Sequence, residues 1–202
     1  MESFVQGIAE VVFGEASRAA RRRRASAFAA SLGLRFHAEG RPGDDASSGW
    51  FDELEMLGVP FVQPVADTFA GSHQGRHVLG FENLVWSKRK RRNVPHRFTA
   101  VKLVRAVPDL LVANETPAWF KPDAPCLPVP APQGSVVSAA DPGSASAVLA
   151  ALRGQGPLDH SWMVRANWVI GWHRGRLRTG GANDAASALE FLTSAADACE
   201  RS

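Results

Sequence analysis

Apolar residues near both ends of the chain recur at the three- and four-residue spacing of an amphipathic α-helix. In the first segment, Phe4, Ile8 and Val12 share one face, opposite Glu2 and Glu10. Apolar spacing and N-capping residues together predict helices over residues 2–32, 50–57, 144–153 and 185–199. We therefore expect a helix at each end of the fold and two shorter helices between them.

Between the helices the apolar period changes to two, which is typical of β-strands with one buried face. The segment His73–Arg76 fits a hairpin turn, because Gly75 adopts a positive φ without strain. Residues 88–92 would then form the tip of a second hairpin. The predicted strands are 68–72, 77–86, 98–104, 110–112, 136–138 and 162–173, with one more short strand after a turn at 173–176.

The strand predicted over residues 162–173 places Trp162, Trp168 and Trp172 on one face. Burial of that face under the last helix explains such a stripe, and an aromatic wall that binds a ligand is the alternative. We expect the buried sheet face.

These elements predict an α+β fold: an antiparallel sheet or partly closed barrel of about six or seven strands with N- and C-terminal helices. Residues 1–36 would form an N-terminal helix with an Arg-rich collar, and residues 37–202 a single α+β domain. Six of the 13 prolines fall within residues 117–132, which predicts an extended, Pro-rich crossing there.

The net positive charge of the chain comes from two short runs of Lys and Arg. The chain has 23 Lys and Arg against 20 Asp and Glu, a net charge of +3. Without the nine cations of two short runs, 14 Lys and Arg would face 20 Asp and Glu, a net charge of −6. The basic character is therefore local, and we predict that these residues bind a partner. They are Arg21, Arg22, Arg23 and Arg24 on the first helix and Lys88, Arg89, Lys90, Arg91 and Arg92 at the second hairpin tip.

No motif with catalytic or cofactor-binding spacing occurs in the sequence. Cys126 and Cys199 lack the spacing of a zinc site, and His73 and His77 are more simply loop histidines than metal ligands. We therefore predict no cofactor, no metal ion and no catalytic residue. The chain is expected not to be an enzyme, and an enzyme with an unrecognised site is the third alternative below.

The basic runs predict a binding or scaffold protein that engages an acidic partner, either another protein or an anionic membrane surface. A nucleic-acid-binding protein that uses the same cations is the second alternative. Trp86 and Phe98 bracket the second run, but we expect them to be the last inward-facing residues of their strands.

No apolar run reaches the length needed to cross a bilayer, and the charges around residues 8–13 do not fit a signal peptide. These features predict a cytoplasmic protein, with peripheral association at the inner face of the membrane as a further expectation.

Several short motifs resemble those of a group of actinobacterial proteins whose activity is not established. Their layout has an N-terminal apolar helix, an Arg-rich stretch and a β-rich domain. The matching stretches here are Arg21–Phe36, Gly71–Phe81, Pro108–Val112 and Trp168–Leu177. The strand number and the C-terminal helix are also similar to pleckstrin-homology-like barrels, which is an analogy of fold alone.

Overall fold

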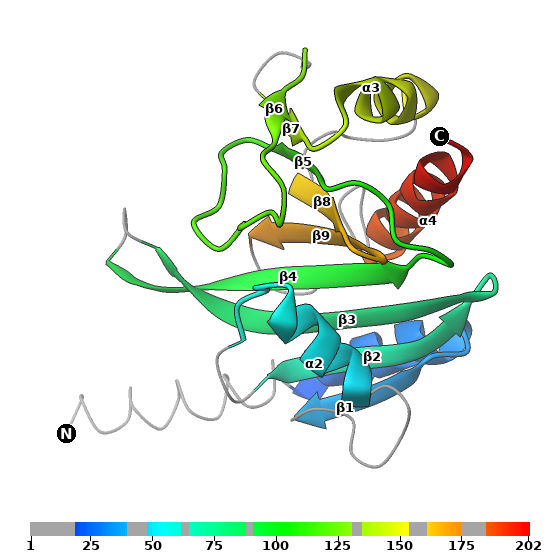
Figure 1. The fold of residues 1–202 in the computed structure, drawn as a ribbon. Helices are drawn as coiled ribbons and strands as arrows, with labels where there is room; N and C mark the ends of the chain where they lie inside the picture. Colours follow the sequence, from blue (N-terminus) through cyan, green and yellow to red (C-terminus); the bar gives the residue numbers. More distant parts are fainter. Residues whose placement is uncertain are drawn as a thin grey trace.

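The computed structural model describes residues 19–39, 48–61, 65–87, 91–130, 135–153, 161–174 and 185–202. These residues form a nine-stranded antiparallel sheet in the order β1-β2-β3-β4-β9-β8-β5-β7-β6, with helices on both faces (Figure 1). The strands are β1 (Arg35–Glu39), β2 (Ala66–His73), β3 (Arg76–Ser87), β4 (Arg92–Lys102), β5 (Leu110–Ala113), β6 (Leu127–Pro128), β7 (Val136–Ala139), β8 (Ser161–Arg165) and β9 (Trp168–Arg174). The helices are α2 (Ser48–Met56), α3 (Pro142–Ala151) and α4 (Ala185–Arg201), and residues 19–31 are also helical.

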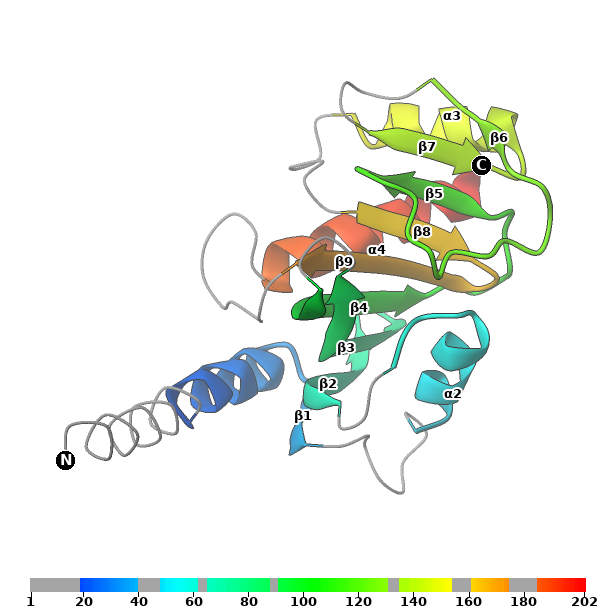
Figure 2. The ribbon, with the colours of Figure 1, turned by 90° about the vertical axis from the view of Figure 1, so that its left-hand side faces the viewer.

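The sheet separates two apolar cores. On one face, the helix of residues 19–31 together with α3 and α4 covers a core that includes Ala29 and Leu189, the α4-side core. On the other face, α2 covers a core that includes Phe51 and Phe120, the α2-side core. Figure 2 shows α4 and the helix of residues 19–31 on one side of the sheet and α2 on the other.

The predicted α+β class, with helices at both ends of the described fold, is confirmed. The described strands outnumber the six or seven that were predicted, and they form an open sheet rather than a partly closed barrel. Two of the additional strands are β1 and β6; β6 has only two residues and lies inside the Pro-rich crossing. Residues 2–18 of the first predicted helix, and the strand expected after residue 176, lie outside the described residues.

The prediction of one strand over residues 162–173 is wrong, because the chain reverses there. A two-residue turn that begins at Ala166, with φ +49°, separates β8 from β9. Trp162 then lies opposite Gly171 in the register and faces the α4-side core, whereas Trp168 belongs to the α2-side core. Trp162 and Trp168 are an even number of positions apart and would share a face in one continuous strand. The turn between them places them on opposite faces of the sheet.

Two glycines let bulky side chains lie directly on the centre of the sheet. A Cβ atom at Gly80 of β3 would overlap the ring of Phe69, and one at Gly171 of β9 would lie 3.0 Å from Leu192 Cδ1 of α4. Both glycines belong to strand interiors, where glycine itself weakens a strand. Close packing of neighbouring side chains is the physical reason for glycine at both positions.

Gly80→Ala is expected to lower the free energy of unfolding by about 2 kcal/mol, because the new methyl group must displace the buried ring of Phe69. Gly49→Ala is the matched control: Gly49 lies in α2 with no atom within 4 Å of its Cβ position. The control should be neutral or more stable by up to about 1 kcal/mol. Urea unfolding of both variants measures the difference, and equal stabilities would contradict the packing argument.

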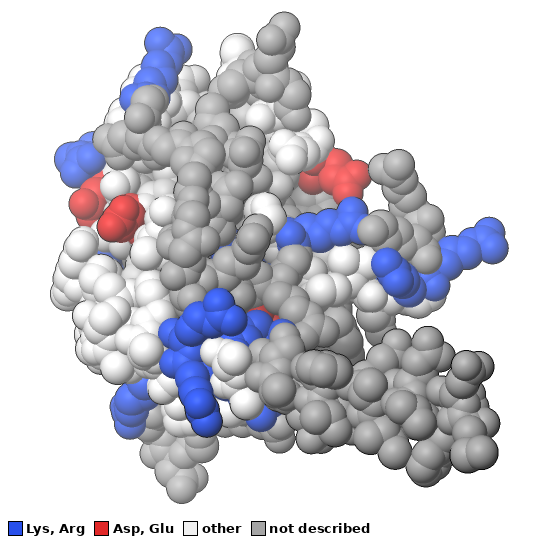
Figure 3. All heavy atoms as spheres, turned by 180° about the vertical axis from the view of Figure 1, so that it is seen from behind, with Lys and Arg blue, Asp and Glu red and all other residues white. Residues whose placement is uncertain are grey.

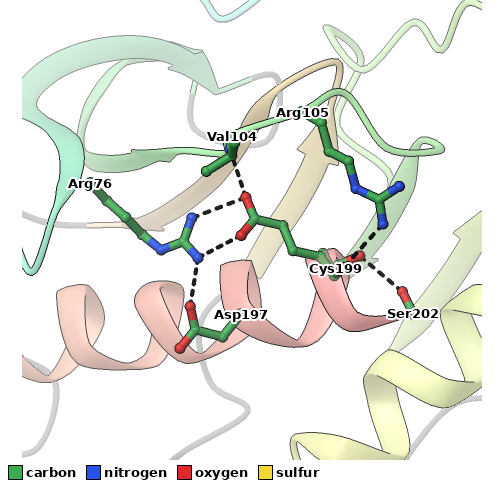
Figure 4. Close-up of polar contacts among 7 residues, drawn as sticks. Arg76, Val104, Arg105, Asp197, Cys199 and Ser202 are labelled. Atoms are coloured by element: carbon green, nitrogen blue, oxygen red, sulfur yellow. Dashed lines mark hydrogen bonds and ion pairs between the residues drawn. The ribbon is translucent and has the colours of Figure 1, made fainter.

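The C-terminal turns of α4 are fixed to two loops by a guanidinium–carboxylate cluster (Figure 4). Arg76 Nη1 and Nη2 donate to the two Glu200 oxygens at 3.1 and 2.7 Å, and Nη2 also donates to Asp197 Oδ1 at 2.6 Å. Glu200 Oε1 accepts a further hydrogen bond from the Val104 amide at 2.6 Å. The hydrogen bonds from Arg76, before any other cause, lower the pKa of Glu200 below its ordinary value. The cluster ties α4 to the β2–β3 turn and to the β4–β5 loop.

Arg76→Met should lower the free energy of unfolding at pH 7 by about 2 kcal/mol, since it removes charged hydrogen bonds from two carboxylates. Because the pKa of Glu200 is lowered from 4.5, this stabilisation is complete above that pH and is lost as the pH falls through the folded-state pKa. The wild-type protein should therefore lose more stability than Arg76→Met between neutral pH and pH 3. Thermal unfolding over this pH range tests the difference, with the exposed Arg201→Met as a control that should follow the wild type.

Candidate functional site

The outer end of the β3–β4 hairpin is a free two-stranded arm. β2 pairs with β3 only as far as Glu82, and β9 pairs with β4 only as far as His96. The four pairs from Leu84–Pro95 to Ser87–Arg92 therefore have no described strand on either outer side. We call residues 84–87 and 91–95 the arm, and Figure 1 shows it reaching past the rest of the sheet.

The two faces of the arm differ in exposure. Val85 packs against the α2-side core, and its cross-strand partner Val94 is buried. On the opposite face, Leu84 is 44% exposed and Trp86 is 59% exposed. One face of the arm therefore fastens it to the body of the protein, while the other presents an aliphatic and an aromatic side chain to the surroundings.

Trp86 was expected to be the last inward-facing residue of its strand, and this expectation is wrong. Phe98 is fully buried, as predicted. Trp86 differs because the β3–β4 hairpin extends past β2 and β9, so that nothing in the described structure covers the face on which Trp86 lies. The alternation of apolar residues predicted the strand correctly. Only the pairing between strands decides which of its residues are buried by neighbouring elements.

Cations lie at the end of the arm. Arg91, with φ +48°, and Arg92 are both exposed. The other three predicted binding residues of this run, Lys88, Arg89 and Lys90, lie outside the described residues. In the sequence, no Asp or Glu occurs between Glu82 and Asp109. The arm therefore belongs to a stretch of chain that carries positive charge only.

The four arginines of the first helix have two different environments. Asp67, only 2% exposed, lies 3.4 Å from Arg21 Nε and 3.6 Å from Arg22 Nε. Arg23 and Arg24 are exposed. The predicted collar is thus divided: two arginines pair with a buried carboxylate of β2, and two face outward.

Both groups of cations appear on the side of the molecule seen in Figure 3. One group projects at the edge where the arm ends, and the other lies over the helix of residues 19–31. Whether the two runs act as one binding surface stays a prediction.

The arm is anchored where Asn83 pairs with His96. Asn83 Nδ2 donates to the Pro60 carbonyl at 2.6 Å, and His96 Nδ1 lies 3.0 Å from the Val94 carbonyl. Burial is the largest cause that lowers the pKa of His96, and the nearby charge of Arg174 lowers it further. The imidazole at the root of the arm is therefore held in its neutral form.

His96→Gln should make the stability of the protein less sensitive to pH. The unfolded chain takes up a proton on His96 near pH 6.5, whereas the folded chain does so only at lower pH. Stability should consequently fall as the pH drops below 6.5, and the variant should lose less stability than the wild type between pH 7 and pH 5. Chemical unfolding at both pH values tests this, and equal losses would contradict the assignment.

A second polar cluster surrounds the buried Arg165 of β8. Its guanidinium donates to the Leu57 carbonyl at 2.6 Å and to Asp123 Oδ1 at 2.8 Å, with Asp109 Oδ2 at 4.0 Å. Burial raises the pKa of Asp109, and burial also raises the pKa of the neighbouring Cys126 thiol. A thiol with a raised pKa is a weak nucleophile. The contacts of Arg165 join β8 to the end of α2 and to the Pro-rich segment, which is a structural role.

Other residues considered from the sequence also have structural contacts. The ring of His77 packs against Trp50 at 4.6 Å between centroids. Cys199 is buried in the α4-side core, and burial raises the pKa of its thiol to about 11. Within the described residues, no group of three or more His, Cys, Asp or Glu side chains is placed to hold a metal ion.

These features define an α+β protein with an open antiparallel sheet and a protruding two-stranded arm. No protein-family model and no curated protein matches the sequence. A crystal structure of the mycobacterial trehalose monomycolate transport factor A, TtfA, is similar, with a TM-score of 0.61 and 13% sequence identity over 88% of this chain and 93% of that chain. At this identity the likeness shows the fold alone. It agrees with the coarse resemblance to actinobacterial proteins.

Proposed function

We propose that this chain is a non-enzymatic binding or scaffold protein that engages an acidic partner through the arm. The observation that supports this most directly is the arm itself, with Trp86 and Leu84 exposed on a hairpin that has no described strand on either outer side. A two-stranded hairpin gains little stability of its own in water. Exposed aromatic side chains are typical of contact surfaces. The arm therefore has the composition of a binding element.

Charge supports an acidic partner. Arg91 and Arg92 end the arm, and the sequence between them and Ser87 adds Lys88, Arg89 and Lys90. No carboxylate in this stretch neutralises them. The acidic partner is another protein or the anionic surface of a membrane, and in the second case the association is peripheral. Within the described residues, no helix is long and apolar enough to cross a membrane.

The helix arginines contribute unequally in this proposal. Arg21 and Arg22 are paired with Asp67, so they mainly fix the helix to the sheet. The exposed Arg23 and Arg24 are the residues of this run that remain for a partner. The similar structure is named a transport factor, and at 13% identity that name assigns no role to this chain, so the proposal rests on the arm.

Retention on an immobilised polyanion tests the proposal. Arg91→Glu/Arg92→Glu should elute at clearly lower salt than the wild type, because two contacts become repulsive. Arg153→Glu/Arg201→Glu is the matched control: both arginines are exposed, and the variant changes the net charge by the same amount away from the arm.

The control should elute much closer to the wild type than the arm variant does. Equal losses in the two variants would show that retention follows net charge alone, and the assignment of the contact to the arm would fail. Circular dichroism of each variant verifies that the fold is retained.

A further inference from the structure

Building on the proposed function, we infer that the acidic partner is an anionic phospholipid bilayer, and that Trp86 and Leu84 are the side chains that enter its interfacial region. The arm then acts as a peripheral membrane anchor. Its apolar face contacts the lipid, while the arginines at its end bind lipid phosphates.

The pairing pattern places the two apolar side chains together. Leu84 and Trp86 are two positions apart on β3, so they project from the same face. Their cross-strand partners on that face are Pro95 and Asn93, neither of which carries a charge. Within the arm this face therefore carries no charge, and the next pair on the same face, Glu82–Arg97, is charged but buried.

The chemistry of the side chains matches an interface. Indole combines an apolar body with an N–H donor, and tryptophan is enriched where a membrane meets water. The guanidinium groups of Arg91 and Arg92 are exposed and pair well with phosphate. Arg92 lies opposite Ser87 in the register and so projects from the Val85 face, and its long side chain extends the positive charge at the end of the arm. The exposed cations over the first helix appear on the same side of the molecule as the cations at the end of the arm (Figure 3).

A contact made by two apolar side chains and a few cations suits a bilayer better than a folded protein or a nucleic acid. A stable protein interface buries roughly 800 Å² on each partner, far more than two partly exposed side chains supply. Single-stranded nucleic acid binds along a basic groove with successive aromatic platforms, and this face of the arm offers only Trp86. A bilayer needs only a few inserted side chains together with diffuse positive charge.

Co-sedimentation of the full chain with lipid vesicles tests the inference. The protein should bind vesicles of phosphatidylcholine with phosphatidylglycerol and should bind pure phosphatidylcholine far less. Trp86→Ala should lower the partition coefficient for the anionic vesicles about tenfold. Met56→Ser is the control, since it removes an apolar side chain that is 78% exposed but lies on α2, and its binding should equal that of the wild type.

A fluorescence measurement shows whether Trp86 itself enters the lipid. Vesicles with bromine-labelled acyl chains should quench tryptophan emission in the wild type. They should quench much less in Trp86→Phe, which retains an aromatic ring and should still bind. Quenching that is unchanged in Trp86→Phe would overturn the insertion of this side chain.

The outcomes separate this inference from the proposed function. If polyanion retention depends on Arg91 and Arg92 but neither anionic vesicles nor a short oligonucleotide binds, the membrane inference fails alone, and an acidic protein remains the proposed partner. If a short single-stranded oligonucleotide binds through the same arginines while vesicles do not, the partner is nucleic acid and both proposals fail. Equal binding to neutral and anionic vesicles would also overturn the inference.

Discussion

The continuous pairing of β3 with β4 is the constraint on which the rest of the structure depends. Ten register pairs run from Val78–Val101 to Ser87–Arg92 without a bulge, so the face of every side chain along the hairpin is fixed. The inner pairs supply residues to both cores. In this part of the hairpin β3 also pairs with β2, and β4 pairs with β9. The outer pairs continue past those neighbours. The same ladder therefore builds the centre of the fold and leaves one face of the arm without cover from the described residues.

Arginine serves two purposes in this protein, and burial distinguishes them. Arg76 and Arg165 are largely buried, and carboxylates or carbonyl groups accept their hydrogen bonds. A guanidinium in such a place is stable only with partners, because desolvation of an unpaired charge is costly. Arg91 and Arg92 are exposed, lie in a stretch without carboxylates and retain their hydration. Only the second kind can exchange water for an external anion at low cost.

The likeness to TtfA at 13% identity shows that very different sequences form this fold. An open antiparallel sheet with helices on both faces requires alternating apolar residues and a few small residues such as Gly80 and Gly171, where bulky groups cross the sheet. Many sequences satisfy these requirements. A binding function depends instead on particular exposed side chains, and it has to be argued from this chain's own residues.

Helical spacing at the chain ends and the period of two between them were sufficient to predict the α+β class and most of the individual elements. The turn at Gln74 and Gly75, both with positive φ, was also predictable, because Gly75 adopts that conformation without strain. Local preferences of this kind are carried by neighbouring residues, so they can be read without knowledge of the fold.

The tertiary structure alone decided which residues are covered. The sequence could not show that the chain reverses at Ala166 and sends Trp162 and Trp168 to opposite faces, since alternation looks the same in one strand and in two. It placed the basic run of residues 88–92 at a hairpin tip, but it gave no sign that Trp86 is exposed or that Asp67 pairs with Arg21 and Arg22. Exposure and ion pairing depend on where neighbouring strands end and which elements meet, and these are properties of long-range contacts rather than of local sequence.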